Sequence, residues 1–413
     1  MVNKDIKSTY WQELELKEPH YFFAPKNFSS EENYDKFISL KDIFDKFNAG
    51  IATGKDEVLV DFNEDSLIRK LSITDKDLFE NTMKNYKVKD ELIDEWYKEL
   101  KEGNIEEQIK KYNYRIFDKR FIIYNNKILQ RARDVLMRHL LKDNISLVTT
   151  KILSSKEYKH VSVSDCISDR CFISNRGREA NYFFPLYFYG FHKKFVLKGQ
   201  KHLDMLGVQK ELDEFNREKK SNIKEEIIKE LSELYKKQIS TEEIFYYIYG
   251  VLYSNLYRKQ YEEFLKIDFP KIPFTKDKKL FYKISVVGKE LIDLHLLKSE
   301  KLNKLSAAFP VSTGDILTDG KVEKREYNLK EKRVYINEKQ YFEEVEPGIW
   351  NYYIGGYQVL DKWLKDRLGR KLSSEAVNHY LKIITTIKYT INLQKEIDKL
   401  YPEIEKNLIE FNN

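Results

Sequence analysis

Residues 108–124 read QIKKYNYRIFDKRFIIY, and this stretch combines dense positive charge, aromatic residues and a strand-like pattern. Residues 108–138 contain nine Lys or Arg and two Asp, a local net charge of +7, whereas the whole chain carries only +6. The rest of the chain is therefore nearly balanced in charge. A basic excess in one segment is typical of a surface that faces a polyanion.

Length and composition set the outer bounds. A chain of 413 residues with 41% hydrophobic and 34% charged residues can bury a large core in two or three units. The two cysteines, Cys166 and Cys171, indicate a reducing compartment rather than a disulfide framework. No apolar run approaches the roughly 18 to 20 residues of a membrane span, and the N-terminus has no apolar signal core. We therefore expect a cytoplasmic protein.

The apolar pattern predicts strands, then helices, then strands. Apolar and polar residues alternate over 57–62, 145–149, 159–164, 171–174 and 182–189, which predicts strands. Over 64–111 apolar residues recur three and four positions apart, which predicts helices. The period then changes, and helical stripes over 211–237 and 280–297 flank a capping box at Ser240–Glu243. A β-hairpin or two adjacent strands are predicted over 321–327 and 333–337, and a strand over 350–358 that Gly355 and Gly356 interrupt. The last helix is expected from Ser373 or Ser374 to about Leu400, before Pro402.

Motifs for catalysis are missing or incomplete. The sequence has no Pro-Pro for an amino-methyltransferase loop and no Pro-Asp for a common Mg²⁺-dependent nuclease. Residues 50–55 nearly spell a phosphate-binding loop, but Asp56 stands where Ser or Thr should hold magnesium, so a glycine-hinged turn is the better interpretation. Cys166, Cys171 and His160 lack zinc-site spacing and are more simply buried groups. We predict no metal site and no self-sufficient catalytic site.

Several stretches resemble the C-terminal specificity region of single-chain restriction–modification enzymes of types ISP and IIG, the adenine-specific DNA methyltransferase family. In chain order they are YWQEL (10–14), GIATGKD (50–56), YRIFDKRFIIY (114–124), KHVSVSD (159–165), YFFPLY (182–187) and IGGYQVLDKWL (354–364). The resemblance covers nearly the whole chain and begins where the family's methyltransferase domain ends. It implies a target-recognition region that binds duplex DNA and works with a methyltransferase domain or subunit, which would bind S-adenosylmethionine. No cofactor is expected in this chain.

The expected fold class is α+β, a mixed-sheet target-recognition domain with an α-helical insert and a long C-terminal spacer helix. The predicted division is 1–48, a lead-in from a missing methyltransferase domain; 49–200, a basic α+β recognition part; 201–305, a helical block; 306–372, a second β-rich recognition part; and 373–413, the spacer helix. Because the chain starts where the catalytic domain would end, we expect a fragment, an expressed domain or a split gene.

Two sets of side chains are predicted to contact DNA. The predicted phosphate contacts are Lys55, Lys119, Arg120, Arg131, Arg133, Arg138, Lys151 and Lys362. The predicted base readers, chosen for the donors and acceptors that a base edge needs, are Ser155, Lys159, Ser162, Ser164, Asp165, Asp169, Arg178, Lys324, Arg325, Tyr327, Arg333 and Tyr335. The two groups of base readers are expected to flank one DNA groove.

Two other functions fit the same residues. An RNA-binding protein would show the same basic and aromatic composition, and competition between duplex DNA and RNA separates the two. A helical scaffold protein would use its charges for solubility and would bind no nucleic acid. Each predicted cation also has a simpler interpretation as part of a solvated, salt-bridged surface, and each Asp as a turn cap.

Overall fold

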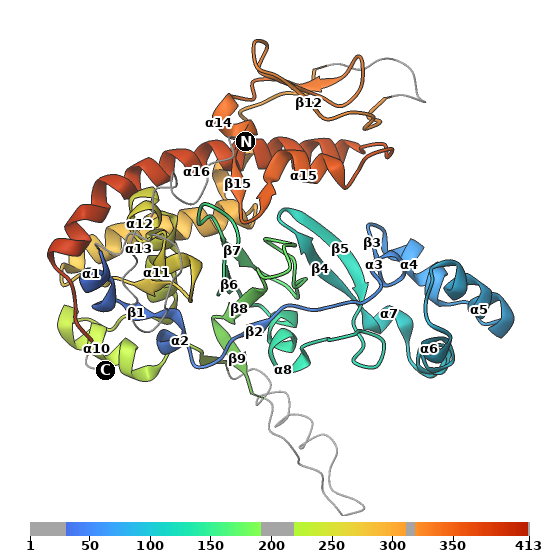
Figure 1. Cartoon of the computed structure of the whole chain (residues 1–413), viewed down its shortest axis with the longest axis horizontal. Coiled ribbons are helices and arrows are strands. Elements are labelled where there is room, and N and C mark those ends of the chain that lie inside the picture. Colours follow the sequence, from blue (N-terminus) through green and yellow to red (C-terminus); the bar gives the residue numbers. More distant parts are fainter. Residues whose placement is uncertain (1–29, 191–218, 311–318, 412–413) are drawn as a thin grey trace, which may run out of the picture.

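A four-stranded antiparallel sheet lies at the centre of the molecule and separates two hydrophobic cores (Figure 1). The computed structural model describes residues 30–190, 219–310 and 319–411. The strand order is β2 (Asn48–Ala49), β8 (Asn181–Pro185), β6 (Ser146–Thr150) and β7 (Val161–Ser164). Strand β6 therefore pairs with β8 on one side and with β7 on the other.

Alternation along β6 and β8 lets one sheet serve both cores. Val148 pairs with Phe183 and both belong to the first core, whereas Leu147 pairs with Phe184 and both belong to the second. Successive side chains of a strand point to opposite faces of its sheet. Both faces are therefore buried, which explains the apolar runs of these strands.

The first core contains most of the β-structure. Strand β5 (Asp118–Ile123) lies between β3 (Val60–Asp61) and β4 (Ile109–Arg115), and β13 (Arg333–Tyr335) lies between β12 (Glu326–Asn328) and β14 (Tyr341–Phe342). The hairpin of β15 (Tyr353–Ile354) and β16 (Tyr357–Gln358) and the short helices α3 (Asp56–Leu59), α8 (Asp134–Met137), α14 (Pro347–Trp350) and α15 (Val359–Lys365) complete this part. A 3-10 helix, η1 (Arg138–Leu141), follows α8.

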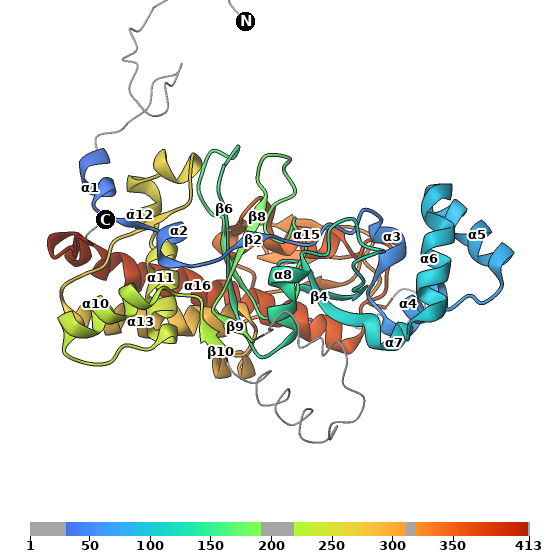
Figure 2. The ribbon, with the colours of Figure 1, turned by 90° about the horizontal axis from the view of Figure 1, so that it is seen from below.

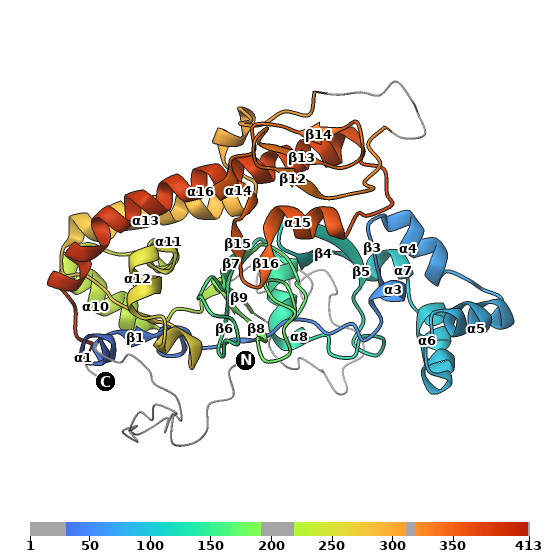
Figure 3. The ribbon, with the colours of Figure 1, turned by 45° about the horizontal axis from the view of Figure 1, so that its top comes forward.

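A helical arm extends from this part, and Figure 3 shows its outer helices α5 and α6 at one end of the molecule. The arm consists of α4 (Glu64–Leu71), α5 (Lys76–Asn85), α6 (Asp90–Glu102) and α7 (Ile105–Gln108). Asn63, Asp75 and Asn104 cap α4, α5 and α7 with their side chains, as residues of this type do at helix starts.

The second core is mainly helical. Its helices are α1 (Glu31–Asp35), α2 (Leu40–Ile43), α10 (Glu225–Tyr235), α11 (Thr241–Tyr253), α12 (Asn255–Gln260) and α13 (Lys278–His295), with the 3-10 helix η2 (Phe264–Lys266). A further 3-10 helix, η3 (Glu300–Asn303), follows α13. Short strand pairs β1 (Ile38–Ser39) with β11 (Lys271–Ile272), and β9 (Tyr187–Tyr189) with β10 (Lys219–Ser221), join its parts. Helices α11 and α13 cross closely at Gly288, where an added Cβ would lie 1.9 Å from the carbonyl oxygen of Tyr246.

Helix α16 (Ser374–Lys406) joins the two cores. Its 33 residues give a length of about 50 Å at 1.5 Å per residue. Tyr380 and Ile384 in its first half belong to the first core, and Ile397 and Ile404 in its second half belong to the second. The helix is thus packed over most of its length.

The predicted α+β class, the strands at β6 to β8, the hairpin of β12 and β13, the capping box at Ser240 and the long last helix are confirmed. Four local predictions are wrong. Residues 350–358 do not form one strand: Trp350 ends α14, and the chain turns at Gly355, with φ of 60°, so that β15 pairs with β16. Residues 56–59 form α3, because Val58 and Leu59 are both buried instead of alternating, and only β3 remains a strand. Residues 171–174 are not a strand, because the Ile173 N–H donates to the side chain of Asn181 at 2.6 Å instead of joining a ladder.

The fourth error concerns the end of the last helix. Pro402 lies inside α16, which continues to Lys406. A proline removes one backbone donor, and burial of Tyr401 and Ile404 holds the last turns in place. The lead-in motif at 10–14 and the start of the 211–237 stripe lie outside the described residues, and the five-part division of the chain stays a prediction.

Candidate nucleic-acid interface

The basic segment 108–138 is less free than its charge suggests. Five of its nine cations form ion pairs within the protein: Arg115, Lys119, Arg120, Lys127 and Arg138. The remaining four, Lys110, Lys111, Arg131 and Arg133, have no carboxylate within ion-pair distance in the part of the chain that the structure describes. About half of the predicted polyanion surface is therefore neutralised internally.

Asp118 is the centre of a buried charge cluster that pairs with one of these cations, Arg120, and with Arg367 from outside the segment. Its carboxylate, 1% exposed, accepts from Arg120 at 2.7 Å and from Arg367 at 2.8 Å. The Arg120 guanidinium also lies 4.0 Å from the ring centroid of Phe62. Burial raises the pKa of Asp118, but the two arginines outweigh it and hold the pKa below its ordinary value. The cluster joins β5 to the segment after α15, so Arg120 contributes to packing and is poorly placed for a phosphate.

Three predicted base readers are buried, and this part of the prediction is wrong. Ser162 is 2% exposed, Ser164 is 0% exposed and Asp169 is 4% exposed. The Ser164 hydroxyl bonds to Ser168 at 2.6 Å, and Asp169 pairs with Arg115 at 2.9 Å. No base edge can reach these groups. Asp165 is also largely enclosed, between Lys119 at 2.7 Å and Lys298 at 3.1 Å.

The second predicted set, on and around β12 and β13, is paired with residues of the same sheet region and of α15. Lys324 contacts Glu326 and Glu338, Arg325 pairs with Asp361, Arg333 pairs with Glu331 and Glu343, the Tyr335 hydroxyl donates to Glu331, and the Tyr327 hydroxyl donates to the carbonyl of Val345. Carboxylates beside these cations would repel a phosphate backbone. The structure therefore does not bring this set forward as a nucleic-acid surface.

The other predicted phosphate contacts differ in exposure. Arg131 is exposed. Arg133 is half-buried, and its backbone lies in the left-handed region with φ of 57°. Lys55 donates to the carbonyl of Lys87 at 2.6 Å, and Lys362 is half-buried against Asp366. Lys151 is exposed, with Asp268 at 3.9 Å.

Two neighbouring loops keep their cations at the surface. We call residues 151–160 loop A, which joins β6 to β7, and residues 174–179 loop B, which precedes β8. Figure 2 shows the loops beside β6 and β8 projecting from the same side of the molecule. The cations of the two loops are Lys151, Lys156, Lys159, Arg176 and Arg178, and the surface carboxylate is Glu157.

The two loops hold five cations and two carboxylates, Glu157 at the surface and the buried Glu179, which gives them a net charge of +3. Lys156 and Arg178 are exposed and have no side-chain partner among the residues described. Lys159 contacts Glu157 at 2.7 Å, and Arg176 donates to the Ser155 hydroxyl at 2.9 Å, from one loop to the other. Such a surface suits a polyanion, and its arginines suit guanine edges or phosphates.

One buried carboxylate, that of Glu179, holds the two loops together. It is 1% exposed. Its Oε1 accepts from the backbone N–H and hydroxyl groups of Ser154 and Ser155, at 2.6 to 3.0 Å. Its Oε2 lies 2.9 Å from Nε2 of His160 and accepts from the Ser174 hydroxyl. Six hydrogen bonds from both loops thus meet at one side chain.

The hairpin of β15 and β16 fixes the bases of both loops. The Gly355 N–H donates to the carbonyl of Lys159 in loop A at 2.7 Å, and the Gly356 N–H donates to the carbonyl of Ile173, next to loop B, at 2.9 Å. Gly355 has φ of 60°, and an added Cβ would lie 1.9 Å from the Ile173 oxygen. The close approach that was predicted at this glycine pair is therefore made to neighbouring backbone.

Sequence reasoning missed three residues of this surface: Lys156, Arg176 and Glu179. The first two were available as cations within the predicted recognition stretch. Glu179 offered no local signal, because five of its six donors lie 19 to 25 residues away along the chain.

The described residues contain no helix that is long and apolar enough to cross a membrane. Within the same residues, no group of three or more His, Cys, Asp or Glu is placed to hold a metal ion. Cys166 and Cys171 are unpaired, and burial raises the pKa of Cys166 to about 12.

The family model of the Type ISP C-terminal specificity domain matches residues 42–396. Among solved structures, the fold is similar to that of the ATP-dependent Type ISP restriction-modification enzyme LlaBIII bound to DNA, with 21% identity and a TM-score of 0.65 over 88% of this chain and 24% of that chain. It is also similar to the DrdV–DNA complex, with 16% identity and a TM-score of 0.71 over 95% of this chain and 41% of that chain.

A third similar structure is a nuclease-deletion mutant of the Type ISP restriction-modification enzyme LlaGI in complex with a DNA substrate mimic. It has 19% identity and a TM-score of 0.64 over 95% of this chain and 31% of that chain. The chain thus spans about a quarter to two fifths of the length of these proteins. A search of curated proteins found none that matches.

Proposed function

The chain belongs to the family of Type ISP C-terminal specificity domains, and we propose that it recognises a target sequence in duplex DNA through loops A and B. The observation that carries the proposal is the cationic surface of these loops, which a buried network holds in place. Lys156 and Arg178 supply charge for phosphates, and Arg178 and Lys159 remain candidates for base contacts. The three solved relatives were each obtained with DNA.

The same family membership supports a role within a larger enzyme. We propose that this chain supplies the sequence preference, while an adenine methyltransferase domain or subunit supplies the chemistry and binds S-adenosylmethionine. A methyltransferase must take its target base out of the helix. A domain that grips the neighbouring base pairs would place that base at the catalytic site. We place this work in the cytoplasm, in keeping with the two unpaired cysteines.

The first experiment compares duplex DNA and RNA as ligands of the purified chain. Fluorescence anisotropy with a labelled duplex of random sequence is measured across a salt series, with unlabelled DNA or RNA duplex of equal length as competitor. Log affinity should fall linearly with log salt, with a slope of about 0.9 per phosphate contact. DNA should compete better than RNA. Equal or better competition by RNA, or no binding at low salt, would contradict the proposal.

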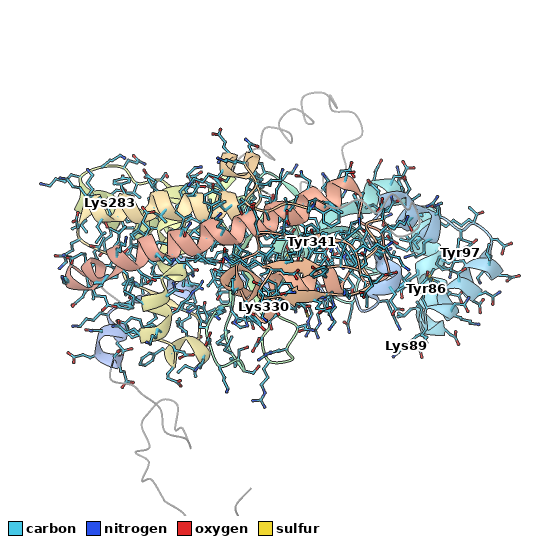
Figure 4. All side chains as sticks on the ribbon, turned by 90° about the horizontal axis from the view of Figure 1, so that it is seen from above. Tyr86, Lys89, Tyr97, Lys283, Lys330 and Tyr341 are labelled. Carbon is cyan, nitrogen blue, oxygen red and sulfur yellow. The ribbon has the colours of Figure 1, made fainter. Side chains whose placement is uncertain are left out.

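Variants of the two unpaired cations locate the surface. The double substitution Lys156→Ala and Arg178→Ala should reduce the salt slope by about 1.8, since two phosphate contacts are lost. The matched control is Lys279→Ala with Lys283→Ala on α13, where both lysines are exposed and have no side-chain partner in the described chain. Figure 4 shows Lys283 at the edge of the molecule formed by α13. A control that weakens binding as much as the loop variant would place the interface elsewhere.

A further inference from the structure

We propose that Glu179 is the positioning residue for base recognition, because it fixes loop A relative to loop B. The inference rests on the proposed function, in which these two loops contact DNA. Glu179 itself is 1% exposed and cannot touch a ligand. Its effect on recognition must therefore pass through the groups that it binds.

The two carboxylate oxygens have different tasks. All four bonds to Oε1 come from Ser154 and Ser155 in the first half of loop A. The partners of Oε2 are His160, at the end of loop A, and Ser174, at the start of loop B. One side chain thus closes loop A on itself and ties it to loop B.

The charge state of the pair suits this role. Burial raises the pKa of Glu179, but hydrogen bonds from His160, Ser154 and Ser174 outweigh it and hold the pKa well below its ordinary value. Burial lowers the pKa of His160, and this exceeds the opposite effect of Glu179. At neutral pH the site therefore holds an ionised carboxylate that accepts hydrogen bonds and a neutral imidazole that donates from Nε2. Hydrogen bonds to a charged acceptor are the stronger kind.

The surface cations are attached to this network through neighbouring residues. Lys156 is the next residue after Ser155, and Arg178 is the residue before Glu179. Arg176 reaches across to the Ser155 hydroxyl, which also donates to Glu179. If the carboxylate is removed, the two loops lose their shared anchor and their cations lose a fixed spacing. Charge is retained, but the geometry that distinguishes one base sequence from another is lost.

The lock can be disturbed without unfolding the sheet. Ser154 is exposed and Ser155 is half-buried, so both can bond to water when the carboxylate is absent. The loop ends remain attached through Gly355 and Gly356. The expected effect of a Glu179 variant is a looser loop pair on an intact fold.

The test uses Glu179→Ala, Glu179→Gln and the control Glu157→Gln. The control removes the surface carboxylate of loop A, Glu157, whose contact is the half-buried Lys159. Hydrogen–deuterium exchange of residues 151–160 is measured on the chain without DNA. Exchange at Ser154 and Ser155 should be at least about tenfold faster in Glu179→Ala, because their N–H groups lose a buried acceptor. Glu179→Gln keeps Oε1 as an acceptor, so its exchange rates should stay nearer those of the wild type. Glu157→Gln should exchange at the wild-type rates.

Binding is then measured with two duplexes. One carries the motif that the wild-type chain enriches from randomised duplex DNA, and the other carries the same bases in scrambled order. Glu179→Ala should lower the affinity ratio between the two at least about tenfold, while its affinity and salt slope for the scrambled duplex stay near those of Glu157→Gln. Its melting temperature should fall, because the buried His160 and Ser174 lose their acceptor, but circular dichroism should show a folded chain at the assay temperature. Unchanged exchange or an unchanged affinity ratio in Glu179→Ala would overturn the positioning role. A wild-type chain that binds no duplex would overturn the proposed function and the positioning role together, and the exchange data would still show whether the lock exists.

Discussion

At the scale of single residues, the position of a charge in the fold decides its role. Arg120 and Lys156 are both cations of predicted recognition stretches, yet Arg120 pairs with the buried Asp118 and Lys156 is exposed without a partner in the described chain. Three of the carboxylates that pair with cations of segment 108–138 come from other parts of the chain: Asp165, Asp169 and Asp366. Counting charge along the chain located a basic region but could not separate these two classes.

Asp118→Asn should lower the free energy of unfolding by about 3 kcal/mol, because it leaves two largely buried guanidinium groups without their carboxylate. Urea denaturation measures the change. The control Asp134→Asn affects a partly exposed carboxylate at 4.0 Å from Arg138, and should change stability by about 0.5 kcal/mol. An Asp118 variant as stable as the control would show that the cluster does not stabilise the fold.

At the scale of elements, the hairpin of β15 and β16 shows both what a pattern can predict and what it cannot. The Gly355–Gly356 pair indicated a close backbone approach, and the structure has one. The neighbours of this pair are Lys159 and Ile173 at the bases of loops A and B, 196 and 183 residues earlier in the chain. A local pattern contains no information about such a partner, and the same limit hid the role of Glu179.

Gly355→Ala should destabilise the protein far more than Gly369→Ala. Both glycines have positive φ, 60° and 79°, which makes an alanine unfavourable by about 1 kcal/mol at either position. An added Cβ meets the Ile173 oxygen only at position 355, whereas nothing lies within 4 Å at position 369. Thermal unfolding of the two variants measures the difference. Equal melting temperatures would mean that the hairpin is not pressed against the loop bases.

At the scale of the whole molecule, the sequence predicted the succession of strands, helices and strands but not how they share cores. Strand alternation was evident, yet it could not show that the two faces of β6 and β8 belong to different cores. The last helix was expected as a spacer, and its buried residues also join both cores. Contacts of this kind depend on tertiary packing, which leaves only weak traces in one sequence.

Buried histidines make the stability of the whole fold depend on pH. Burial lowers the pKa of His295 to about 3, and burial with the nearby Arg138 lowers that of His139 to about 4. The unfolded chain binds protons below its ordinary histidine pKa of about 6.5, whereas the folded chain does not, so stability falls as pH decreases from 6.5. At pH 5 each of these two residues should therefore make the unfolding free energy about 2 kcal/mol lower than it is above pH 6.5.

Urea denaturation at pH 7.5, 6 and 5 tests this expectation. The variant His295→Gln can still bond to Tyr249 and Thr390, the two partners of the imidazole, but no longer titrates. Its stability should therefore decrease less between pH 7.5 and 5 than that of the wild type. An equal decrease in both proteins would assign the pH dependence to other groups.

The central claim is that loops A and B recognise a DNA sequence, and selection from randomised duplex DNA tests it most directly. The intact chain should enrich a short motif and bind it at least about tenfold more tightly than a scrambled duplex, and the Lys156→Ala, Arg178→Ala variant should bind both duplexes more weakly. The claim is contradicted if no motif is enriched, or if the loop variant selects and binds the same motif as tightly as the wild type.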